Sequence, residues 1–587
     1  MLRPVLGAAA AAIALSILSA PADAAPAPFG NPCAAQTGVR FCPATSLDQR
    51  VPSFDGLPLD VDVTLPAKGD GPFPTVVLLH GWGASKTAYE TTTNAKAGTF
   101  SNVGLAKAGY AVVTPSARGF GRSCGQPLTV RTAGCAKGWL HLADQRYEAR
   151  DVQTLLGKLV DERVAKASGL GVSGGSYGGG EAMELAFLKD RVRRTDGSFT
   201  AWRSPKGARL AIAAAYPIIP WSDLASAQLP NGRDASVTNP VGVEIFSYLN
   251  RQYVGAQATG YVAPPGVDPT ADLGGWIELF NAGEPYGSKA QTILHELSTY
   301  HSSMSLLTRG ARPAPLLMLS GWTDDLFPPI QTLRVYDALR AKDKRAPVWL
   351  QLDDFGHARG GFHAHDQATL AAQGLAFFDT HLKGARHQLP KPGSVLAFGQ
   401  TCPNLAPSGL GPFRSRSFDA LHTGRVRFGA SGPQTVTSTG GDQALAAALN
   451  PKPLTLGGLS GDPCATFPAA VEDGTATATK RVSKAITYLG LGRIDATVKT
   501  TGPYGQLNAR LWDVAAGKQT LIDRSVYRLT PNQAGKIAFD LHGNAYRFAP
   551  GHTIKLELIG NDYPTHLRSN GTFTVTVSKL SLRLPTR

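Results

Sequence analysis

The sequence predicts an α/β fold with a helical insertion, followed by an all-β unit. Up to about residue 385, short apolar runs alternate with stretches of helical pattern, as in a parallel sheet covered by helices. Between about residues 222 and 312, this alternation gives way to a long, aromatic, helix-like segment. After about residue 390, helical patterns become scarce, and short alternating strands follow one another between turns rich in Gly, Pro and Thr.

Each apolar run in the first part has the length and composition of a buried strand. These runs cover residues 74–79, 110–115, 169–172, 210–216, 315–320 and 347–352. Buried strands that alternate with helices predict a parallel α/β sheet with helices on both faces.

The inserted segment and the final part are expected to fold differently from this sheet. An insertion of such length usually forms a cap over the C-terminal edge of the sheet, where ligands bind in open α/β folds. In the final part, alternating runs such as 507–514 and 573–577 predict an antiparallel β-sandwich. The predicted organisation is a catalytic unit at 25–390, with the cap at 222–312, and a sandwich at 391–587.

The N-terminus has the pattern of a secretory signal peptide. It begins with Met1-Leu2-Arg3, continues with an apolar stretch over residues 5–18, and reaches the small-x-small site Ala22-Asp23-Ala24. We expect residues 1–24 to be removed by cleavage after Ala24 and the mature protein to be secreted. No other run approaches ~20 apolar residues, so no transmembrane segment is expected after cleavage.

Six cysteines follow this leader, in three pairs that are close in the sequence. An even number in an exported chain favours disulfides, although six cysteines permit 15 connectivities. Proximity favours the pairs Cys33–Cys42, Cys124–Cys135 and Cys402–Cys464. No pair has C-x-x-C spacing and no His/Cys cluster suggests zinc, so neither a metal nor another cofactor is expected.

The chain is basic, with a formal net charge of +15 that signal removal leaves unchanged because Arg3 and Asp23 cancel. The basic residues are scattered and no nucleic-acid motif is present, so nucleic acid is not an expected partner. This charge would suit electrostatic association with anionic cell-wall polymers, and it also fits an ordinary solvated basic surface.

A serine between glycines marks the expected site of chemistry. Ser176 lies in Gly174-Gly175-Ser176-Tyr177-Gly178, ahead of a helix-like stretch at 181–188. Such a run is the signature of a nucleophile elbow, a turn so tight that side chains two positions either side of the serine would collide. The pattern alone is weak, because the chain has 65 glycines and holds a second, overlapping match around Ser173.

The partners that a nucleophilic serine needs follow in the required order. A serine hydroxyl attacks when an imidazole takes its proton and a carboxylate orients that imidazole. In α/β-hydrolases, the acid and then the histidine follow the serine, each at the end of a later strand. The strand after the cap ends in Gly321-Trp322-Thr323-Asp324, and the next is followed by Gly356-His357. The sequence therefore predicts an α/β-hydrolase with a triad of Ser176, His357 and Asp324.

Each triad member is preferred over a close neighbour. The helix follows Ser176 more directly, Asp324 comes first after its strand, and His357 follows a strand and a glycine. The alternatives are Ser173 as nucleophile, Asp325 as acid, and His363 or His365 as base.

Backbone amides are expected to hold the developing oxyanion. One is the N–H of Tyr177, directly after the nucleophile, and the other comes from the loop after an early strand. That loop reads His80-Gly81-Trp82-Gly83, and we assign the second donor to Trp82. His80 is expected to have a structural role in this turn.

Several motifs agree with one known family. They are residues 176–179 (SYGG), 118–125 (RGFGRSCG), 321–324 (GWTD), 547–552 (RFAPGH) and 561–564 (NDYP). In these motifs the chain resembles the X-Pro dipeptidyl-peptidase and cocaine-esterase family of serine hydrolases, over nearly the whole mature chain. The resemblance implies a catalytic α/β domain, a helical cap, and a jelly-roll-like C-terminal sandwich like that of X-Pro dipeptidyl-peptidases.

The sequence departs from this family at the oxyanion loop. The family's esterases and dipeptidases use a tyrosine hydroxyl there, whereas this chain has His80-Gly81-Trp82-Gly83, as ordinary lipases and esterases do. The resemblance also implies an acidic group that holds the free amine of an X-Pro substrate. Glu244, Glu278 and Glu284 in the cap are the candidates.

The sequence thus predicts an exported serine hydrolase that acts through an acyl-enzyme on a peptide or an ester. A dipeptidyl-peptidase-like activity is preferred. A lipase- or carboxylesterase-type hydrolase is the alternative, and a non-catalytic cell-wall binding protein is the third hypothesis. The same catalytic groups serve peptides and esters, so the pocket under the cap must decide between them.

Overall fold

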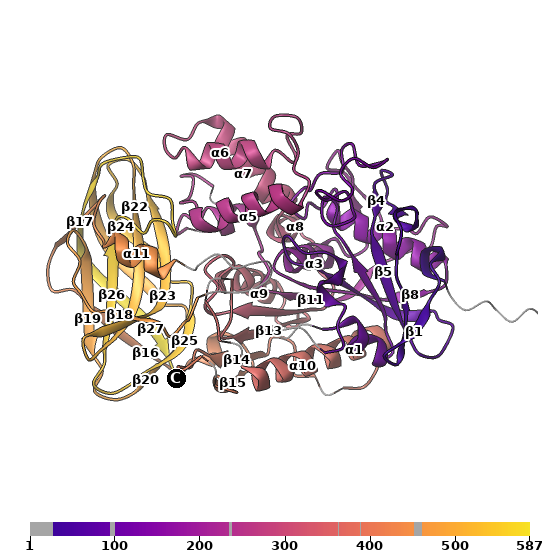
Figure 1. The fold of residues 1–587 in the computed structure, drawn as a ribbon. Coiled ribbons are helices and arrows are strands. Elements are labelled where there is room, and N and C mark those ends of the chain that lie inside the picture. Colours follow the sequence, from indigo (N-terminus) through magenta and orange to yellow (C-terminus); the bar gives the residue numbers. More distant parts are fainter. Residues whose placement is uncertain are drawn as a thin grey trace, which may run out of the picture.

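The computed structural model describes residues 27–93, 100–233, 238–357, 359–361, 363–387, 389–404, 406–450 and 461–587. The expected signal peptide, with its cleavage site, lies outside these residues. Figure 1 shows an α/β unit and a β-sandwich side by side, with a group of helices above the α/β unit.

An 11-stranded mixed sheet organises the α/β unit. Its strands, in their order across the sheet, are β1 (Ala34–Gln36), β2 (Val39–Cys42), β5 (Val61–Pro66), β7 (Ala111–Pro115), β6 (Phe73–Leu79), β8 (Ala165–Gly175), β11 (Ile212–Ile218), β12 (Leu316–Gly321), β13 (Val348–Asp353), β14 (Val395–Gly399) and β15 (Leu410–Ser415). Neighbours from β7 to β14 run parallel, which confirms the predicted parallel sheet in its centre. Antiparallel strands, which the sequence did not predict, extend both edges.

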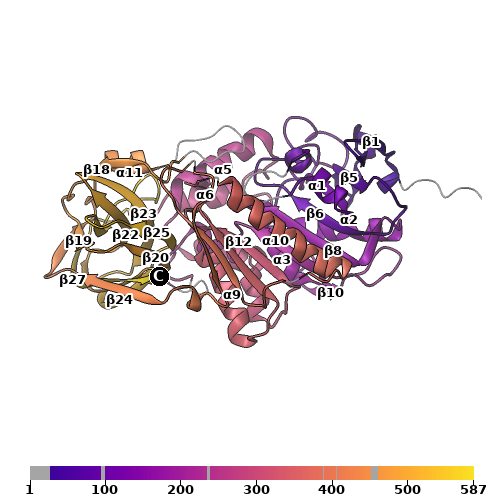
Figure 2. The same ribbon diagram turned by 90° about the horizontal axis from the view of Figure 1, so that it is seen from below.

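Helices cover both faces of this sheet because successive residues of a strand point to opposite sides. In β6, Val76 and Leu78 join the apolar cluster that includes residues of α1 (Asn102–Lys107) and α10 (Ala364–Lys383). Figure 2 shows α10 crossing the sheet. Val77 and Leu79 join the opposite cluster. The helices on that side are α2 (Glu148–Asp161), α3 (Tyr177–Leu188) and α9 (Ile330–Lys342).

The inserted segment forms a helical cap, as predicted. Its helices are α4 (Leu224–Gln228), α5 (Phe246–Thr259), α6 (Leu273–Asn281), α7 (Ser288–Tyr300) and α8 (Ser303–Thr308). Tyr248, Trp276 and Phe280 are buried in one apolar cluster with Tyr177, the first residue of α3. The cap core therefore reaches the start of the helix that follows Ser176.

Two antiparallel sheets form the sandwich, with one apolar cluster between them. One sheet contains β24 (Ala534–Asp540), β21 (Arg493–Thr501), β27 (Thr574–Thr586), β20 (Ile486–Gly490) and β25 (Asn544–Phe548), and β16 (Gly424–Gly429) and β17 (Gln434–Thr437) pair with β27. The other contains β18 (Thr466–Pro468), β23 (Lys518–Leu529), β22 (Gly505–Ala515), β26 (Thr553–Ile559) and β19 (Ala476–Arg481). The remaining strands and α-helix of the described chain are short: β3 (Val51–Pro52), β4 (Pro58–Leu59), β9 (Arg191–Arg193), β10 (Phe199–Ala201) and α11 (Gln443–Leu449).

The predicted start of the sandwich at residue 391 is too early. β14 and β15 lie in the sheet of the α/β unit, and the first strand of the sandwich is β16, which begins at Gly424. The error has a physical cause, because a short antiparallel strand at the edge of a mixed sheet has the same local sequence pattern as a sandwich strand.

All three predicted disulfides are present: Cys33–Cys42, Cys124–Cys135 and Cys402–Cys464. The third joins the segment after β14 to the segment before β18. Within the described ranges, none of the helices combines the length and apolar character needed to cross a membrane.

Candidate active site

Ser176 lies in a sharp turn between β8 and α3. Its backbone has φ 59° and ψ −115°, a conformation that a non-glycine residue adopts only where the surroundings enforce it. A Cβ atom on Gly174 would lie 2.5 Å from the Leu79 carbonyl oxygen, and one on Gly178 would lie 2.1 Å from it. Both flanking glycines are therefore needed for the turn to pack against the end of β6.

Three side chains from separate strand ends form one hydrogen-bonded chain. His357 Nε2 lies 2.6 Å from Ser176 Oγ, and His357 Nδ1 lies 2.6 Å from Asp324 Oδ2. They come from the ends of β8, β13 and β12, which are parallel and therefore finish at the same edge of the sheet. The structure thus brings together the three residues that the sequence predicted, in the order that the chemistry requires.

The turn after β12 holds Asp324 in place. The second carboxylate oxygen, Oδ1, accepts hydrogen bonds from the backbone N–H groups of Leu326 at 2.9 Å and Phe327 at 2.8 Å. The Phe327 ring also packs edge-on against the His357 imidazole, with centroids 5.0 Å apart. Asp324 is fully buried, so both of its oxygens are committed to these partners.

The alternative candidates all have other partners. The closest polar contacts of their side chains are Ser173 Oγ to the Tyr216 carbonyl at 2.7 Å, Asp325 to Arg359 at 3.3 Å, His363 to the Ala406 carbonyl at 2.5 Å, and His365 to Ser408 at 3.3 Å. In the described part of the chain, none of these four contacts a triad member through a hydrogen bond. The geometry therefore favours Ser176, Asp324 and His357 over each of them.

The loop after β6 lies against the elbow, as the oxyanion assignment requires. A Cβ atom on Gly81 would come within 3.9 Å of the Ser176 Cβ, and the Trp82 and Tyr177 rings pack with centroids 5.4 Å apart. His80 has a structural contact, because its Nε2 accepts from the Ala117 N–H at 2.9 Å. Burial lowers the pKa of His80 to about 4, so the ring stays neutral.

Nothing in the sequence marked Tyr89, which also contacts the elbow. Tyr89 ends a short 3₁₀ helix (Lys86–Tyr89), and its hydroxyl accepts from the Gly175 N–H at 3.0 Å, one residue before Ser176. Burial raises the pKa of Tyr89 to about 12, so the phenol remains protonated. A contact between residues this far apart in the chain leaves no local pattern to detect.

An apolar pocket under the cap opens beside Trp82. Its walls include Leu142, Leu249, Trp276 and Phe280, and one buried carboxylate, Glu244, lines it as well. Burial raises the pKa of Glu244 to about 8. Among the described residues no cationic side chain pairs with Glu244, so the pocket combines mostly apolar walls with one acid that lacks a countercharge.

The other two cap glutamates do not line this pocket. Glu278 is exposed on α6. Glu284 is buried in an ion pair with Arg528 of the sandwich and accepts from the Asn570 N–H at 3.1 Å. Of the three predicted amine-binding candidates, only Glu244 lines the pocket under the cap.

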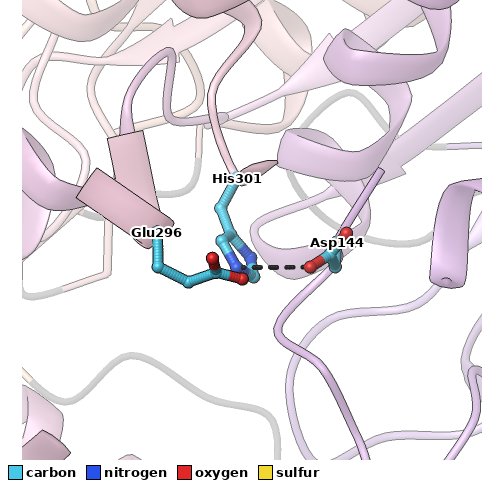
Figure 3. Close-up of side chains that lie close together, drawn as sticks. All are labelled: Asp144, Glu296 and His301. Atoms are coloured by element: carbon cyan, nitrogen blue, oxygen red, sulfur yellow. Dashed lines mark ion pairs between the residues drawn. The ribbon is translucent and has the colours of Figure 1, made fainter. Parts of the chain in front are cut away.

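A second cluster of ionisable groups lies between cap helix α7 and the loop before α2. Asp144, Glu296 and His301 each bring one atom of metal-ligand type to within 4.8 Å of the others (Figure 3). One Arg146 guanidinium nitrogen, however, donates to both carboxylates. We therefore assign the cluster to an ion-pair network that joins cap helix α7 to the loop before α2.

Two parts of the sequence match the X-Pro dipeptidyl-peptidases. Residues 55–195 match the X-Pro dipeptidyl-peptidase family, and residues 421–585 match the X-Pro dipeptidyl-peptidase C-terminal non-catalytic domain. Residues 274–385 match the prolyl oligopeptidase family. Ser176 lies in the first match, and Asp324 and His357 lie in the third. No curated protein matches the sequence.

Solved structures of similar fold include several hydrolases. An α-amino acid ester hydrolase has 15% identity and a TM-score of 0.59, with 96% of this chain and 100% of that chain covered. A CocE/NonD family hydrolase from Staphylococcus aureus has 12% identity and a TM-score of 0.57, with 94% of each chain covered. An aminopeptidase from a marine sediment archaeon, Thaumarchaeota archaeon, has 14% identity and a TM-score of 0.57, with 93% and 96% covered. At these identities the likeness concerns the fold.

Proposed function

The chain belongs to the X-Pro dipeptidyl-peptidase and cocaine-esterase family of α/β-hydrolases, and on this premise we propose that it is an exported serine hydrolase acting through an acyl-enzyme at Ser176. The observation that carries the proposal is the continuous hydrogen-bonded chain from Asp324 through His357 to the elbow serine. The N-terminal sequence and the three disulfides support export, since disulfides persist in oxidising compartments.

In the proposed acylation step, His357 Nε2 takes the hydroxyl proton while Ser176 Oγ attacks the substrate carbonyl carbon. Asp324 holds the Nδ1–H and stabilises the imidazolium that forms. The negative charge that develops on the carbonyl oxygen is held by the backbone N–H groups of Trp82 and Tyr177. His357 then returns the proton to the leaving amine or alcohol as the scissile bond breaks.

Deacylation repeats these roles with water as the nucleophile. His357 takes a proton from water, the resulting hydroxide attacks the acyl carbon, and the carboxylic acid leaves as Ser176 Oγ regains its proton. Every proton passes through the same imidazole, so the triad needs no further group for chemistry.

We propose a substrate with a free N-terminal amine, as in a dipeptidyl-peptidase. Support comes from Glu244, a buried carboxylate with no cationic partner among the described residues, in a pocket with mostly apolar walls. An ammonium group entering that pocket would supply the missing countercharge, and an apolar side chain would fit against Trp276 and Phe280. A simple ester offers no partner to Glu244, so the carboxylate favours the peptidase over the esterase.

We expect Glu244→Gln to lower kcat/KM for a dipeptidyl-proline anilide by ~10- to 100-fold. A hydrogen bond to a charged group contributes about 1.5–3 kcal/mol, and the amide keeps the shape of the carboxylate while losing its charge. Turnover of a short-chain nitrophenyl ester should change by less than about 3-fold, because no ammonium is involved. Steady-state kinetics on both substrates checks this.

Glu278→Gln is the matched control for that experiment, since it makes the same change on the exposed face of α6. It should leave both substrates unaffected. Equal losses on anilide and ester in Glu244→Gln would contradict amine recognition. A wild-type enzyme that turns over only the ester would instead favour the esterase alternative, with Ser176 chemistry unchanged.

The pairing also predicts a pH dependence. Glu244, with a pKa of about 8, is largely neutral at pH 6 and becomes ionised as the pH rises, whereas a substrate α-amine loses its proton above about 8. The kcat/KM ratio of the free-amine anilide to its N-acetylated form should therefore rise from pH 6 toward pH 8 and fall above it. The ratio cancels the pH dependence of the chemical steps that both substrates share, and in Glu244→Gln the rise of the ratio below pH 8 should be absent.

A further inference from the structure

Asp325, the neighbour of Asp324, is a second buried carboxylate at the active site, and it contacts arginines from two distant segments. Arg359, two residues after His357, approaches it at 3.3 Å between Nη2 and Oδ1. Arg524 of β23 in the sandwich approaches it at 3.8 Å between Nε and Oδ2. The exposed fractions of Asp325, Arg359 and Arg524 are 4%, 5% and 1%, so solvent screens these charges little.

Two hydrogen bonds around Arg359 tie the same segments together. The Thr323 hydroxyl donates to the Arg359 carbonyl at 2.7 Å, which links the turn that carries Asp324 to the loop that carries His357. Arg359 Nη1 donates to the Leu521 carbonyl of β23 at 3.0 Å. Both triad loops are thus fastened to each other and to one strand of the sandwich.

The same strand also holds the cap. Arg528 is four residues after Arg524, on the same face of β23 because side chains alternate along a strand. It pairs with Glu284 and donates to the Gly242 carbonyl at 2.9 Å. β23 therefore contacts the acid loop, the histidine loop and the cap.

The charges in this contact depend on one another. Although burial raises the pKa of Asp325, Arg359 and Arg524 lower it to about 2, so the carboxylate is ionised. In the described ranges, Arg524 has no hydrogen-bond acceptor for its guanidinium, so its charge is compensated through space by the carboxylates of Asp325 and Asp562. The other titratable groups that face Asp325 are Tyr248 of α5, His542 from the segment between β24 and β25, and His566 from the segment between β26 and β27.

We infer that Asp325 is a positioning residue, which through Arg359 and Arg524 fixes the loops that carry Asp324 and His357, so that β23 of the sandwich is a structural part of the active site. The inference rests on the proposed triad. A misplacement of about 1 Å in a catalytic group costs roughly 10²-fold in rate. Losses of up to this size are expected when the contacts of Asp325 are removed.

The test compares Asp325→Asn and Arg524→Met with the wild type, by kcat and KM per active site, with active sites counted by a fluorophosphonate probe. We expect kcat to fall ~10- to 100-fold in Asp325→Asn and less in Arg524→Met, with KM within about 2-fold. Because both variants disturb one contact, the double variant should lose less than the product of the single losses. If wild-type protein is not labelled by the probe, the proposed function fails. That outcome differs from one in which the wild type is labelled but Asp325 has no positioning role.

The pH profile separates positioning from a change of charge alone. Asp325→Asn removes a negative charge near His357 and Arg524→Met removes a positive one, so electrostatics would move the acid limb of kcat/KM in opposite directions. Loosening of the Asp324–His357 contact would destabilise the imidazolium in both variants. The acid limb of kcat/KM should therefore move to lower pH in Asp325→Asn and in Arg524→Met alike.

Asp540→Asn is the matched control, because Asp540 pairs with Arg493 at 3.0 Å in the sandwich and both side chains are at least 30% exposed. It should leave kcat and the pH profile unchanged. The inference is overturned if Asp325→Asn and Arg524→Met lower only the melting temperature while the kcat per active site stays within 2-fold of wild type. If Asp325→Asn does not fold, Arg524→Met decides by the same criteria.

Discussion

Replacing Ser176 with alanine should lower kcat by ~10⁶-fold, the largest effect expected of any single change in this protein. The proposed acyl bond forms at the Ser176 hydroxyl oxygen, which lies 2.6 Å from His357 Nε2. The backbone already has a positive φ with serine present, and alanine is no bulkier, so the fold should be unchanged. Steady-state kinetics and a thermal melt on the same preparation check both parts of the expectation.

Ser173→Ala is the control for this result. Ser173 is buried in β8 and donates its hydroxyl hydrogen to the Tyr216 carbonyl, so the change should cost about 1 kcal/mol of stability. Its effect on kcat should be no more than a few-fold. If Ser173→Ala abolished turnover and Ser176→Ala did not, the nucleophile would be the other serine of the overlapping motif.

Asp324→Asn should lower kcat by ~10⁴-fold. The asparagine amide would donate to His357 Nδ1, which forces the ring proton onto Nε2 and leaves no acceptor for the Ser176 hydroxyl. The two backbone donors from Leu326 and Phe327 can still bond the asparagine oxygen, so the turn should keep its shape. The measurement is kcat on the best substrate, with circular dichroism to confirm the fold.

Asp325→Asn distinguishes the two neighbouring carboxylates in the same assay. Because Asp325 pairs with Arg359 and makes no contact with His357 in the described residues, its loss should be at least ~100-fold smaller than that of Asp324→Asn. A loss in Asp325→Asn as large as that in Asp324→Asn would reassign the catalytic acid.

The proximity of Ser176, His357 and Asp324 could be predicted because the proposed chemistry imposes a strict local pattern on the chain. The elbow requires glycines at 174 and 178, since any Cβ there would collide with the end of β6. The acid and the histidine must follow at the ends of later parallel strands, and apolar runs mark those strands within one or two residues at β12 and β13. Local rules of this kind are readable from a single sequence.

The features that escaped prediction all depend on contacts between distant segments. β14 and β15 look like sandwich strands in isolation, and only their pairing with β13 places them in the large sheet. No local motif marks the contacts of Tyr89 with Gly175 and of Asp325 with Arg524, because these partners are 86 and 199 residues apart in the sequence. The sequence could not rank the three amine-binding candidates in the cap, and only the fold of the cap shows that Glu244 lines the pocket.

The most direct test of the central claim is the site at which a fluorophosphonate probe labels the full-length mature protein, determined by peptide mass spectrometry. We expect one adduct, on Ser176, which is absent in Ser176→Ala and slowed by orders of magnitude when Asp324 is changed to Asn. An adduct that persists in Ser176→Ala, or no adduct on a folded wild-type protein, would contradict the proposed acyl-enzyme mechanism.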